Sequence, residues 1–158
     1  MAVYTKISKK FLLTVLANYS IGLLINYSEI QEGIENTNYL LITSKGKYIL
    51  TIFENRVDNN EIPFFIELMN HLSKKKFNCP IPQKDKNNQY IQKKNEKYFI
   101  IVSFLEGVWK KKITSCDCHV IGKLIGNLHN KTIDFDYFRE NSMSILGWKY
   151  LLKELKKK

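Results

Sequence analysis

Residues 38–53 read NYLLITSKGKYILTIF and contain two apolar runs separated by a short polar connection. The runs at 38–43 and 48–53 are rich in β-branched and aromatic residues, which predicts two strands. Ser44, Lys45 and Gly46 between them suit a tight turn. In the second run both sets of alternating positions are mostly apolar, so we expect this strand to be buried on at least one side. The stretch therefore predicts an antiparallel pair of strands.

Hydrophobic periodicity along the rest of the chain extends this pair into a sheet with helices. In chain order the sequence predicts a helix at 11–17, strands at 24–32, 38–43 and 48–53, a helix at 61–76, strands at 89–93 and 98–104, and a helix from 114 onward. Three antiparallel strands, a helix and two further strands indicate an α+β fold. After the last helix we expect a loop at 132–144 and a short Lys-rich segment after Trp148.

Local signals mark where the helices begin. Ser8 is placed to cap the first helix, and Pro63 suits the first turn of the second. Thr114, followed three residues later by Asp117, has the pattern of a capping box for the third. On that helix one face is formed by Cys118, Ile121, Ile125 and Leu128. We expect this helix to pack Cys118 inward.

The charge of the chain raises the question of an anionic partner. It has 158 residues, 25 of them basic and 15 acidic, for a net charge of +10. Arg occurs only at positions 56 and 139, whereas readout of phosphates and bases favours the guanidinium group. The lysines also lie in separated clusters. We therefore expect a solvated basic surface rather than a nucleic-acid-binding one, and one domain, or one domain and a fragment, at this length.

Cysteine usage and hydropathy indicate the compartment. The three cysteines, Cys79, Cys116 and Cys118, do not form the paired framework of a secreted domain. No apolar run approaches the ~20 residues that a membrane span needs. We expect a soluble protein of the reducing cytoplasm.

Residue types that carry chemistry are present, but their spacing does not support a catalytic or metal site. Cys116 and Cys118 would point about 200 degrees apart on a helix, so they cannot share one ion with His119. Asp134 and Asp136 could offer carboxylates to Mg²⁺, yet no phosphate-binding glycine or lysine lies at a defined spacing, and a solvated loop is the expectation. The histidines have no Ser or Cys partner at a diagnostic spacing.

The turn at 33–38, Gly-Ile-Glu-Asn-Thr-Asn, has a composition that can present backbone N–H groups and hydroxyls to a phosphate. Taken alone, an ordinary hairpin turn explains it better. The order of the elements changes this balance. A hairpin, a third strand, a helix, two more strands and a hinge ending at Gly107 is the order found in the small lobe of protein-kinase-like folds.

Several segments, in consistent order, resemble the bacterial homoserine kinases of the aminoglycoside-phosphotransferase-like superfamily. They are residues 1–5, 33–41, 48–54, 63–65 with Leu68 and Met69, 79–82, 103–107 and 122–129. The resemblance implies a kinase-like small lobe at 1–106, a five-stranded antiparallel sheet plus helix, followed at 107–158 by the start of a helical large lobe that is incomplete.

The resemblance also implies ATP-dependent transfer of the γ-phosphoryl group to the side-chain hydroxyl of L-homoserine, in threonine synthesis, with Mg²⁺ held by residues of the missing lobe. By position, Gly33 and residues Asn36, Thr37 and Asn38 would cover the phosphates. The Ser103 carbonyl and the Leu105 N–H would hydrogen-bond the adenine edge.

Two positions depart from the general kinase pattern. Thr51 stands where a third-strand lysine usually contacts the phosphates, with Arg56 as a candidate substitute. Glu67 is the nearest counterpart of the helix glutamate that pairs with such a lysine.

The H-x-D-x-x-x-x-N segment that positions the substrate hydroxyl in this fold does not occur in the sequence. We therefore expect no homoserine kinase turnover from this polypeptide alone. It would be a truncated product, a gene fragment, or one piece of a split enzyme whose separate chain supplies the large lobe, and its last helix would expose apolar residues. Three alternatives stay open: a superfamily kinase acting on choline, methylthioribose or an aminoglycoside; a non-catalytic nucleotide- or protein-binding module; and a Lys-rich nucleic-acid binder.

Overall fold

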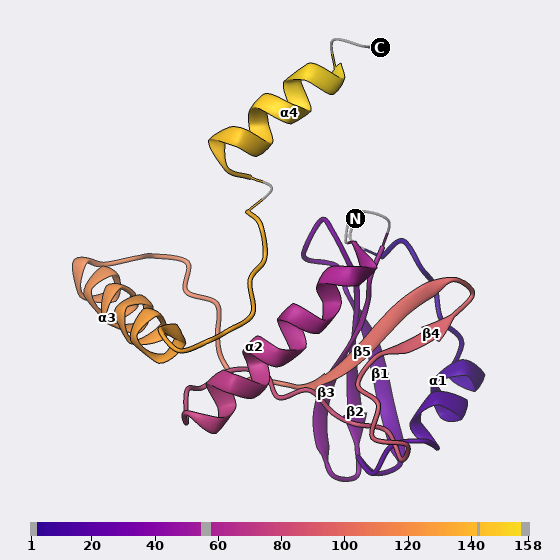
Figure 1. Cartoon of the computed structure of the whole chain (residues 1–158). Helices are drawn as coiled ribbons and strands as arrows, with labels where there is room; N and C mark the ends of the chain where they lie inside the picture. Colours follow the sequence, from indigo (N-terminus) through magenta and orange to yellow (C-terminus); the bar gives the residue numbers. More distant parts are fainter. Residues whose placement is uncertain (1–2, 55–57, 142, 156–158) are drawn as a thin grey trace.

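The computed structural model describes residues 3–54, 58–141 and 143–155. Its centre is one antiparallel sheet with the strand order β1-β2-β3-β5-β4 (Figure 1). The strands are β1 (Leu24–Ile30), β2 (Thr37–Thr43), β3 (Gly46–Ile52), β4 (Gln92–Lys94) and β5 (Lys97–Ser103). The five predicted strands therefore form a common sheet, and the predicted pair at 38–53 is β2 and β3.

Helices cover both faces of this sheet. α1 (Lys9–Leu16) packs on one face, and α2 (Ile62–Lys74), preceded by a short 3₁₀ turn at Asn59–Glu61, packs on the other. Ser8 caps α1 by accepting a hydrogen bond from the Phe11 N–H at 3.2 Å, as predicted. Pro63 lies in the first turn of α2, also as predicted, where its missing N–H removes no helical hydrogen bond.

The alternation of side chains along the strands divides the core into two clusters. The α1 cluster contains Leu12, Tyr39, Leu41, Leu50 and Ile101, all of them buried. The α2 cluster is formed by different positions of β3 and β5 together with α2: Phe53, Ile62, Ile66, Ile100 and Val102. β3 and β5 therefore direct apolar side chains to both faces, which explains why the run at 48–53 shows no polar side.

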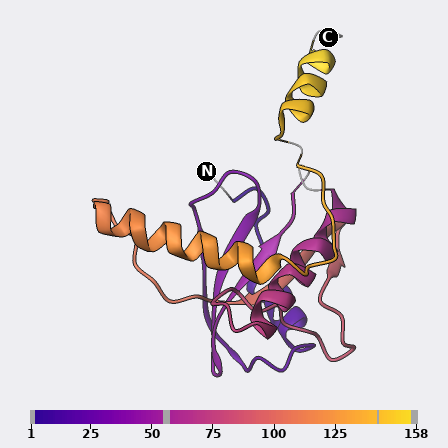
Figure 2. The ribbon, with the colours of Figure 1, turned by 60° about the vertical axis from the view of Figure 1, so that its left-hand side comes forward.

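α3 (Ser115–Thr132) and α4 (Ile145–Leu155) extend away from the sheet (Figures 1 and 2). The Thr114 and Asp117 capping box is present, as predicted. Near its C-terminal end α3 contacts α2, where the Lys131 ammonium donates to the Lys75 carbonyl at 2.6 Å and the Lys131 carbonyl lies 2.8 Å from His71 Nε2. The following segment packs the Phe135 ring against Phe64.

The apolar faces of α3 and α4 are open to solvent. None of the described residues of α3 is buried, and Ile121 and Ile125 are about half exposed. On α4, Leu146, Trp148 and Leu152 are also exposed. The expectation that the helix from 114 exposes apolar residues is confirmed.

Two expectations for this region are wrong. Cys118 is exposed instead of packed inward, because the part of α3 around it is open to solvent and its neighbours Ile121 and Ile125 are exposed as well. Residues 145–155 form a helix where the sequence analysis expected a short Lys-rich segment. The Ser144 hydroxyl accepts the Gly147 N–H at 3.2 Å, which caps this helix in a way that the Lys content concealed. In the described residues no helix is both long and apolar enough to cross a membrane.

The α1 cluster predicts a clear difference between two neighbouring leucines. Leu12 is 0% exposed, whereas Leu13, the next residue around α1, is 50% exposed. We expect Leu12→Ala to lower the free energy of unfolding by about 2–5 kcal/mol, because it opens a cavity in the core. Leu13→Ala should change it by about 0.5 kcal/mol or less. Urea denaturation of both variants measures this, and equal effects would show that α1 does not pack as described.

Candidate functional site

The α2 face of the sheet carries an apolar row of three residues on adjacent strands. Leu40 of β2 lies opposite Ile49 of β3, which lies opposite Val102 of β5. Leu40 and Ile49 are half-buried, so part of their apolar surface stays accessible. These side chains share a face because residues directly opposite each other on paired strands point to the same side of a sheet. The apolar row is a flat surface suited to a planar, weakly polar ring.

A polar pair lies beside the apolar row, one step further along the same strands. Thr51 lies opposite Asn38, and its hydroxyl donates to Asn38 Oδ1 at 2.8 Å. Because every second residue of a strand faces the same side, Asn38 lies next to Leu40 on β2, and Thr51 lies next to Ile49 on β3. The structure thus brings together two of the predicted site residues, Asn38 and Thr51.

The turn at residues 33–36 leads directly into this polar pair. Gly33 has a φ of 111°, a conformation that residues with a side chain rarely adopt. Asn36 is half-buried, and its Oδ1 has no hydrogen-bond partner among the described residues. Because the oxygen and nitrogen of an amide are assigned only from their partners, the same side chain can equally direct its NH₂ group into this position. The turn therefore holds an amide with unused hydrogen-bonding capacity.

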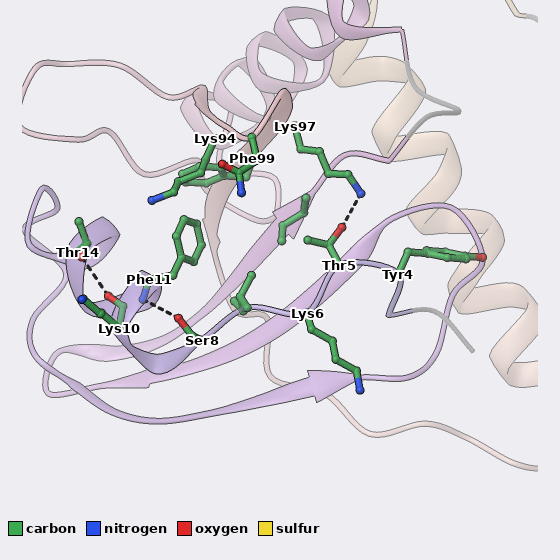
Figure 3. Close-up of a pocket in the computed structure, with 13 residues that line it drawn as sticks. Tyr4, Thr5, Lys6, Ser8, Lys10, Phe11, Thr14, Lys94, Lys97 and Phe99 are labelled. Carbon is green, nitrogen blue, oxygen red and sulfur yellow. Dashed lines mark hydrogen bonds between the residues drawn. The ribbon is translucent and has the colours of Figure 1, made fainter.

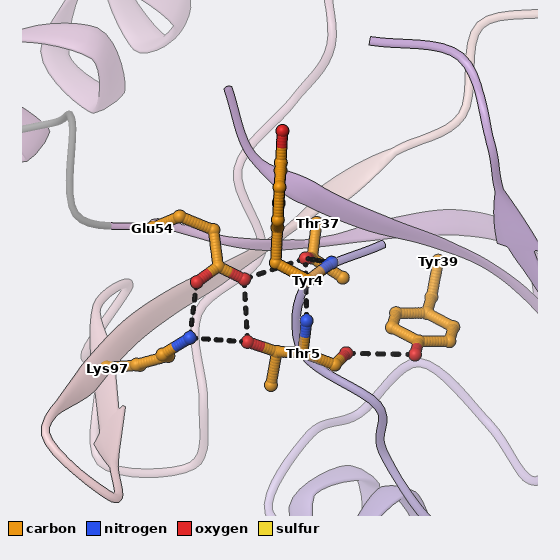
Figure 4. Close-up of polar contacts among 6 residues, drawn as sticks. All are labelled: Tyr4, Thr5, Thr37, Tyr39, Glu54 and Lys97. Atoms are coloured by element: carbon orange, nitrogen blue, oxygen red, sulfur yellow. Dashed lines mark hydrogen bonds and ion pairs between the residues drawn. The ribbon is translucent and has the colours of Figure 1, made fainter. Parts of the chain in front are cut away.

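Thr37 follows the turn but directs its side chain to the opposite face. Its hydroxyl donates to Glu54 Oε1 at 2.7 Å and accepts from the backbone N–H groups of Tyr4 and Thr5 at 2.9 and 3.1 Å (Figure 4). Thr37 is 0% exposed, so its hydroxyl is not available to a ligand over the polar pair. Its side chain instead fixes the end of the turn to the N-terminal segment.

Glu54 joins these contacts to the start of β5. Its carboxylate forms an ion pair with Lys97 and accepts from the Thr5 hydroxyl at 2.6 Å. The side chains of Glu54 and Lys97 are 10% and 36% exposed. Burial by itself raises the pKa of Glu54, but the hydrogen bonds from Lys97, Thr5 and Thr37 outweigh burial and hold its pKa below its usual value.

The end of β5 lies beside the apolar row. The Ser103 N–H donates to the Ile81 carbonyl at 2.9 Å, and the Ser103 hydroxyl accepts from the Ile81 N–H at 2.8 Å. Phe104 N–H then donates to the Lys47 carbonyl at 3.1 Å, and Leu105 follows outside the strand. These contacts fix the backbone at Ser103 and Phe104 before any ligand arrives.

The pairing of β5 with β3 gives the distance between the end of β5 and the polar pair. Ser103 lies opposite Tyr48, and Ile100 lies opposite Thr51, so the two positions are three residues apart, or about 10 Å. The apolar row lies between them on the same face. An elongated ligand with a planar ring near Ser103 and an anionic group near Asn38 and Gly33 fits this arrangement.

The remaining candidate residues lie elsewhere. Arg56 falls outside the described residues. Glu67 is half-buried on α2. Asp134 forms an ion pair with Lys75, whose hydrogen bond lowers the pKa of this carboxyl. Within the described ranges no three His, Cys, Asp or Glu residues are grouped as metal ligands would be, and Cys116 and Cys118 are free thiols.

Sequence reasoning missed the apolar row as part of the site. Leu40, Ile49 and Val102 stand out only when the register of three strands is known, because each is an ordinary strand residue in its own segment. The available signal was the alternation along 38–43, which puts Asn38 and Leu40 on one face. It does not say which face a ligand would use.

A family comparison matches this part of the chain. The model of the family described as "Phosphotransferase enzyme family" matches residues 26–136, which include most of β1, the other four strands, α2 and α3. The chain belongs to the phosphotransferase enzyme family.

Members of this family with curated descriptions are similar along nearly the whole chain. A homoserine kinase from a Chelativorans species is 42% identical over 151 residues, covering 96% of this chain and 47% of that protein. A homoserine kinase from Agrobacterium fabrum is 40% identical with the same two coverages. The chain therefore spans about half the length of the curated relatives it matches.

Solved phosphotransferase structures share the fold. A spectinomycin phosphotransferase in complex with ADP and spectinomycin superposes with a TM-score of 0.69 at 12% identity, covering 96% of this chain and 47% of that one. A microcompartment-associated aminopropanol kinase gives a TM-score of 0.62 at 15% identity, covering 89% and 47%. The chain thus has the small-lobe fold of these kinases, as the sequence analysis predicted.

The lowered pKa of Glu54 predicts that the free energy of unfolding of this chain depends on pH. A carboxyl whose pKa is depressed on folding stabilises the protein above its unfolded pKa of 4.5, and this stabilisation is lost as the pH falls through the folded value. We expect Glu54→Gln to lower the free energy of unfolding by about 1–3 kcal/mol at pH 7. The difference from wild type should shrink as the pH falls below 4.5.

Glu106→Gln is the matched control. Glu106 pairs with Lys47 at 2.7 Å, but both side chains are exposed, at 74% and 45%. Its loss should change stability by about 0–1 kcal/mol. Urea denaturation at a series of pH values measures both variants, and a pH-independent effect of Glu54→Gln would contradict the ionic role of this carboxylate.

Proposed function

We propose that this chain is the nucleotide-binding portion of a homoserine kinase, which uses ATP to phosphorylate the side-chain hydroxyl of L-homoserine in threonine synthesis. The observation that carries the substrate assignment is the similarity to proteins described as homoserine kinases, at about 40% identity over 96% of the chain. The apolar row, with the polar pair and the turn at 33–36 beside it, supports the nucleotide assignment independently.

The adenine ring of ATP would lie on the apolar row. Its polar edge would meet the Ser103 carbonyl and the Leu105 N–H, where the neighbouring contacts to Ile81 and Lys47 hold the backbone in place. Leu40 and Ile49 would lose solvent contact on binding, which favours association. Backbone groups that are already ordered lose little entropy when they bind.

The phosphates would lie at the turn and the polar pair. Gly33 gives the backbone its unusual conformation, and Asn36, Asn38 and Thr51 provide polar side chains around it. Thr37 would act through its backbone N–H, because its hydroxyl is bound to Glu54. Thr51 carries no charge, so we propose that hydrogen bonds from donors of the turn stabilise the phosphates in place of the usual third-strand lysine.

We propose that residues 1–106 form the nucleotide-binding lobe and that residues 107–158 begin the large lobe. Phosphoryl transfer needs a carboxylate that orients the substrate hydroxyl and groups that stabilise the transferring phosphoryl. No H-x-D-x-x-x-x-N segment is present, and the described residues contain no cluster of metal ligands. Mg²⁺, which stabilises charge on the phosphates, would therefore be held by the second half of the family's length.

The exposed apolar faces of α3 and α4 would be the surface that receives that second half. Ile121, Ile125, Leu146 and Leu152 are the side chains that such a lobe would cover. Exposed apolar helix faces of this kind normally mark an interface. We propose that the second half can be supplied by a separate chain, in the cytoplasm, where the free thiols of Cys116 and Cys118 would stay reduced.

A chimera tests the proposed function. We would fuse this chain to the second half of the homoserine kinase from Agrobacterium fabrum and measure ADP formation. We expect ADP formation that requires both ATP and L-homoserine in the chimera, and none from the unfused chain. The physical reason is that the chain contributes the nucleotide face, whereas the partner half contributes the catalytic carboxylate.

Two glycine variants of the chimera separate the phosphate turn from general disturbance. Gly33→Val should reduce kcat/KM for ATP about ten-fold or more, because a β-branched residue is strained at a φ of 111°. Gly107→Ala should have little effect, since an added Cβ meets no atom within 4 Å. A chimera that binds ADP but phosphorylates choline or an aminoglycoside instead of L-homoserine would contradict the substrate assignment.

A further inference from the structure

A cavity of about 750 Å³ lies on the α1 face of the sheet, opposite to the proposed nucleotide face. We call it the lysine cavity. Its walls come from the N-terminal segment, α1, the β4–β5 turn and the strands beneath: Tyr4–Ser8, Lys10, Phe11, Thr14, Ile52, Lys94, Asn95, Lys97 and Phe99. Its size falls in the range of small-molecule sites. The proposed function makes no use of it.

The charged side chains that line the lysine cavity are all positive. Four of the lining residues are lysines, at positions 6, 10, 94 and 97, and none of the described lining residues is acidic. Lys97 is paired with Glu54, whereas Lys6, Lys10 and Lys94 form no ion pair with the described residues. Low-dielectric walls around several like charges concentrate a positive potential, which attracts anions.

The centre of the lysine cavity is aromatic. Phe11 and Phe99 meet edge to face, with ring centroids 5.9 Å apart, whereas the Lys6 and Lys97 side chains extend away from Phe11 (Figure 3). The Lys94 ammonium lies 5.1 Å from the centroid of the Phe11 ring. An apolar group packed against this pair of rings and an anionic group at the lysines would both be satisfied.

Part of the lysine cavity is fixed in place before binding. The Lys97 ammonium donates to the Thr5 hydroxyl at 2.6 Å and to Glu54, so this wall cannot collapse onto the rings. The Ser8 hydroxyl and the start of α1 lie at another edge, where the helix dipole also favours negative charge. Such pre-organisation lowers the entropy lost when a ligand binds.

We propose that the lysine cavity binds a small anionic metabolite that carries a phosphate or carboxylate group on an apolar body. The anionic group contacts Lys10 and Lys94, and the apolar body contacts Phe11 and Phe99. Binding does not require the nucleotide face, so it is tested on the chain as it exists.

The test uses phenyl phosphate as the probe, with benzoate and inorganic phosphate for comparison. Titrations followed by NMR of the backbone amides give both the location and the Kd. We expect phenyl phosphate to shift the amides of the cavity, among them Phe11, Asn95 and Phe99, and to bind more tightly than inorganic phosphate, which lacks a ring. Benzoate replaces the phosphate by a carboxylate on the same ring, and its relative Kd identifies the preferred anion.

A double variant and a charge-matched control give the decisive comparison. Lys10→Gln with Lys94→Gln should raise the Kd for phenyl phosphate about five-fold or more. Lys9→Gln with Lys86→Gln removes the same charge from exposed lysines outside the cavity and should change the Kd less than about two-fold. All four lysines are exposed, so both variants should fold, which the melting temperature checks.

Three results would overturn the proposal. One is no binding of phenyl phosphate to the wild-type chain. Another is an equal loss in the two double variants, which would show that net charge alone attracts the anion. The third is a set of shifts centred on Asn38, Thr51 and Leu105, which would place the probe on the nucleotide face.

Discussion

The arrangement of this lobe depends on the contacts of one buried carboxylate, that of Glu54. It binds Lys97 at the start of β5, Thr5 in the N-terminal segment and Thr37 at the start of β2. A buried carboxylate is costly unless its oxygens are satisfied, and here three donors satisfy them. Since Thr37 also ends the turn that begins at Gly33, the position of that turn is set from the opposite face of the sheet.

This arrangement gives the two faces of one sheet different chemistry. Alternate residues of β3 face α1 or α2, so the same strand provides Ile52 to the lysine cavity and Thr51 to the proposed phosphate site. Two adjacent residues of β3 thus belong to sites on opposite faces of the sheet. A sheet that is buried on both sides can therefore carry two ligand sites without lengthening the chain.

Much of the fold could be predicted from the sequence, because its signals are local. The pair at 38–53, Pro63 in α2 and the Thr114 capping box each depend on neighbouring residues alone. The errors arise where the outcome depends on what packs against a segment. Cys118 is on a helix whose partner face is open, and α4 is capped by Ser144 within a stretch whose lysines suggested a tail. Of the site, Asn38 and Thr51 were named from the family resemblance, whereas the apolar row required the register of three strands.

The two buried clusters have a consequence for how such a lobe is made. Every residue in them precedes Ser103, so the sheet and its core are complete in sequence before α3 begins. On a ribosome the lobe can fold as soon as this part has emerged. In a relative of twice this length, the apolar faces of α3 and α4 would then wait on the order of ten seconds for the rest of the polypeptide. During that interval chaperones, rather than the second lobe, are the natural cover for those helices.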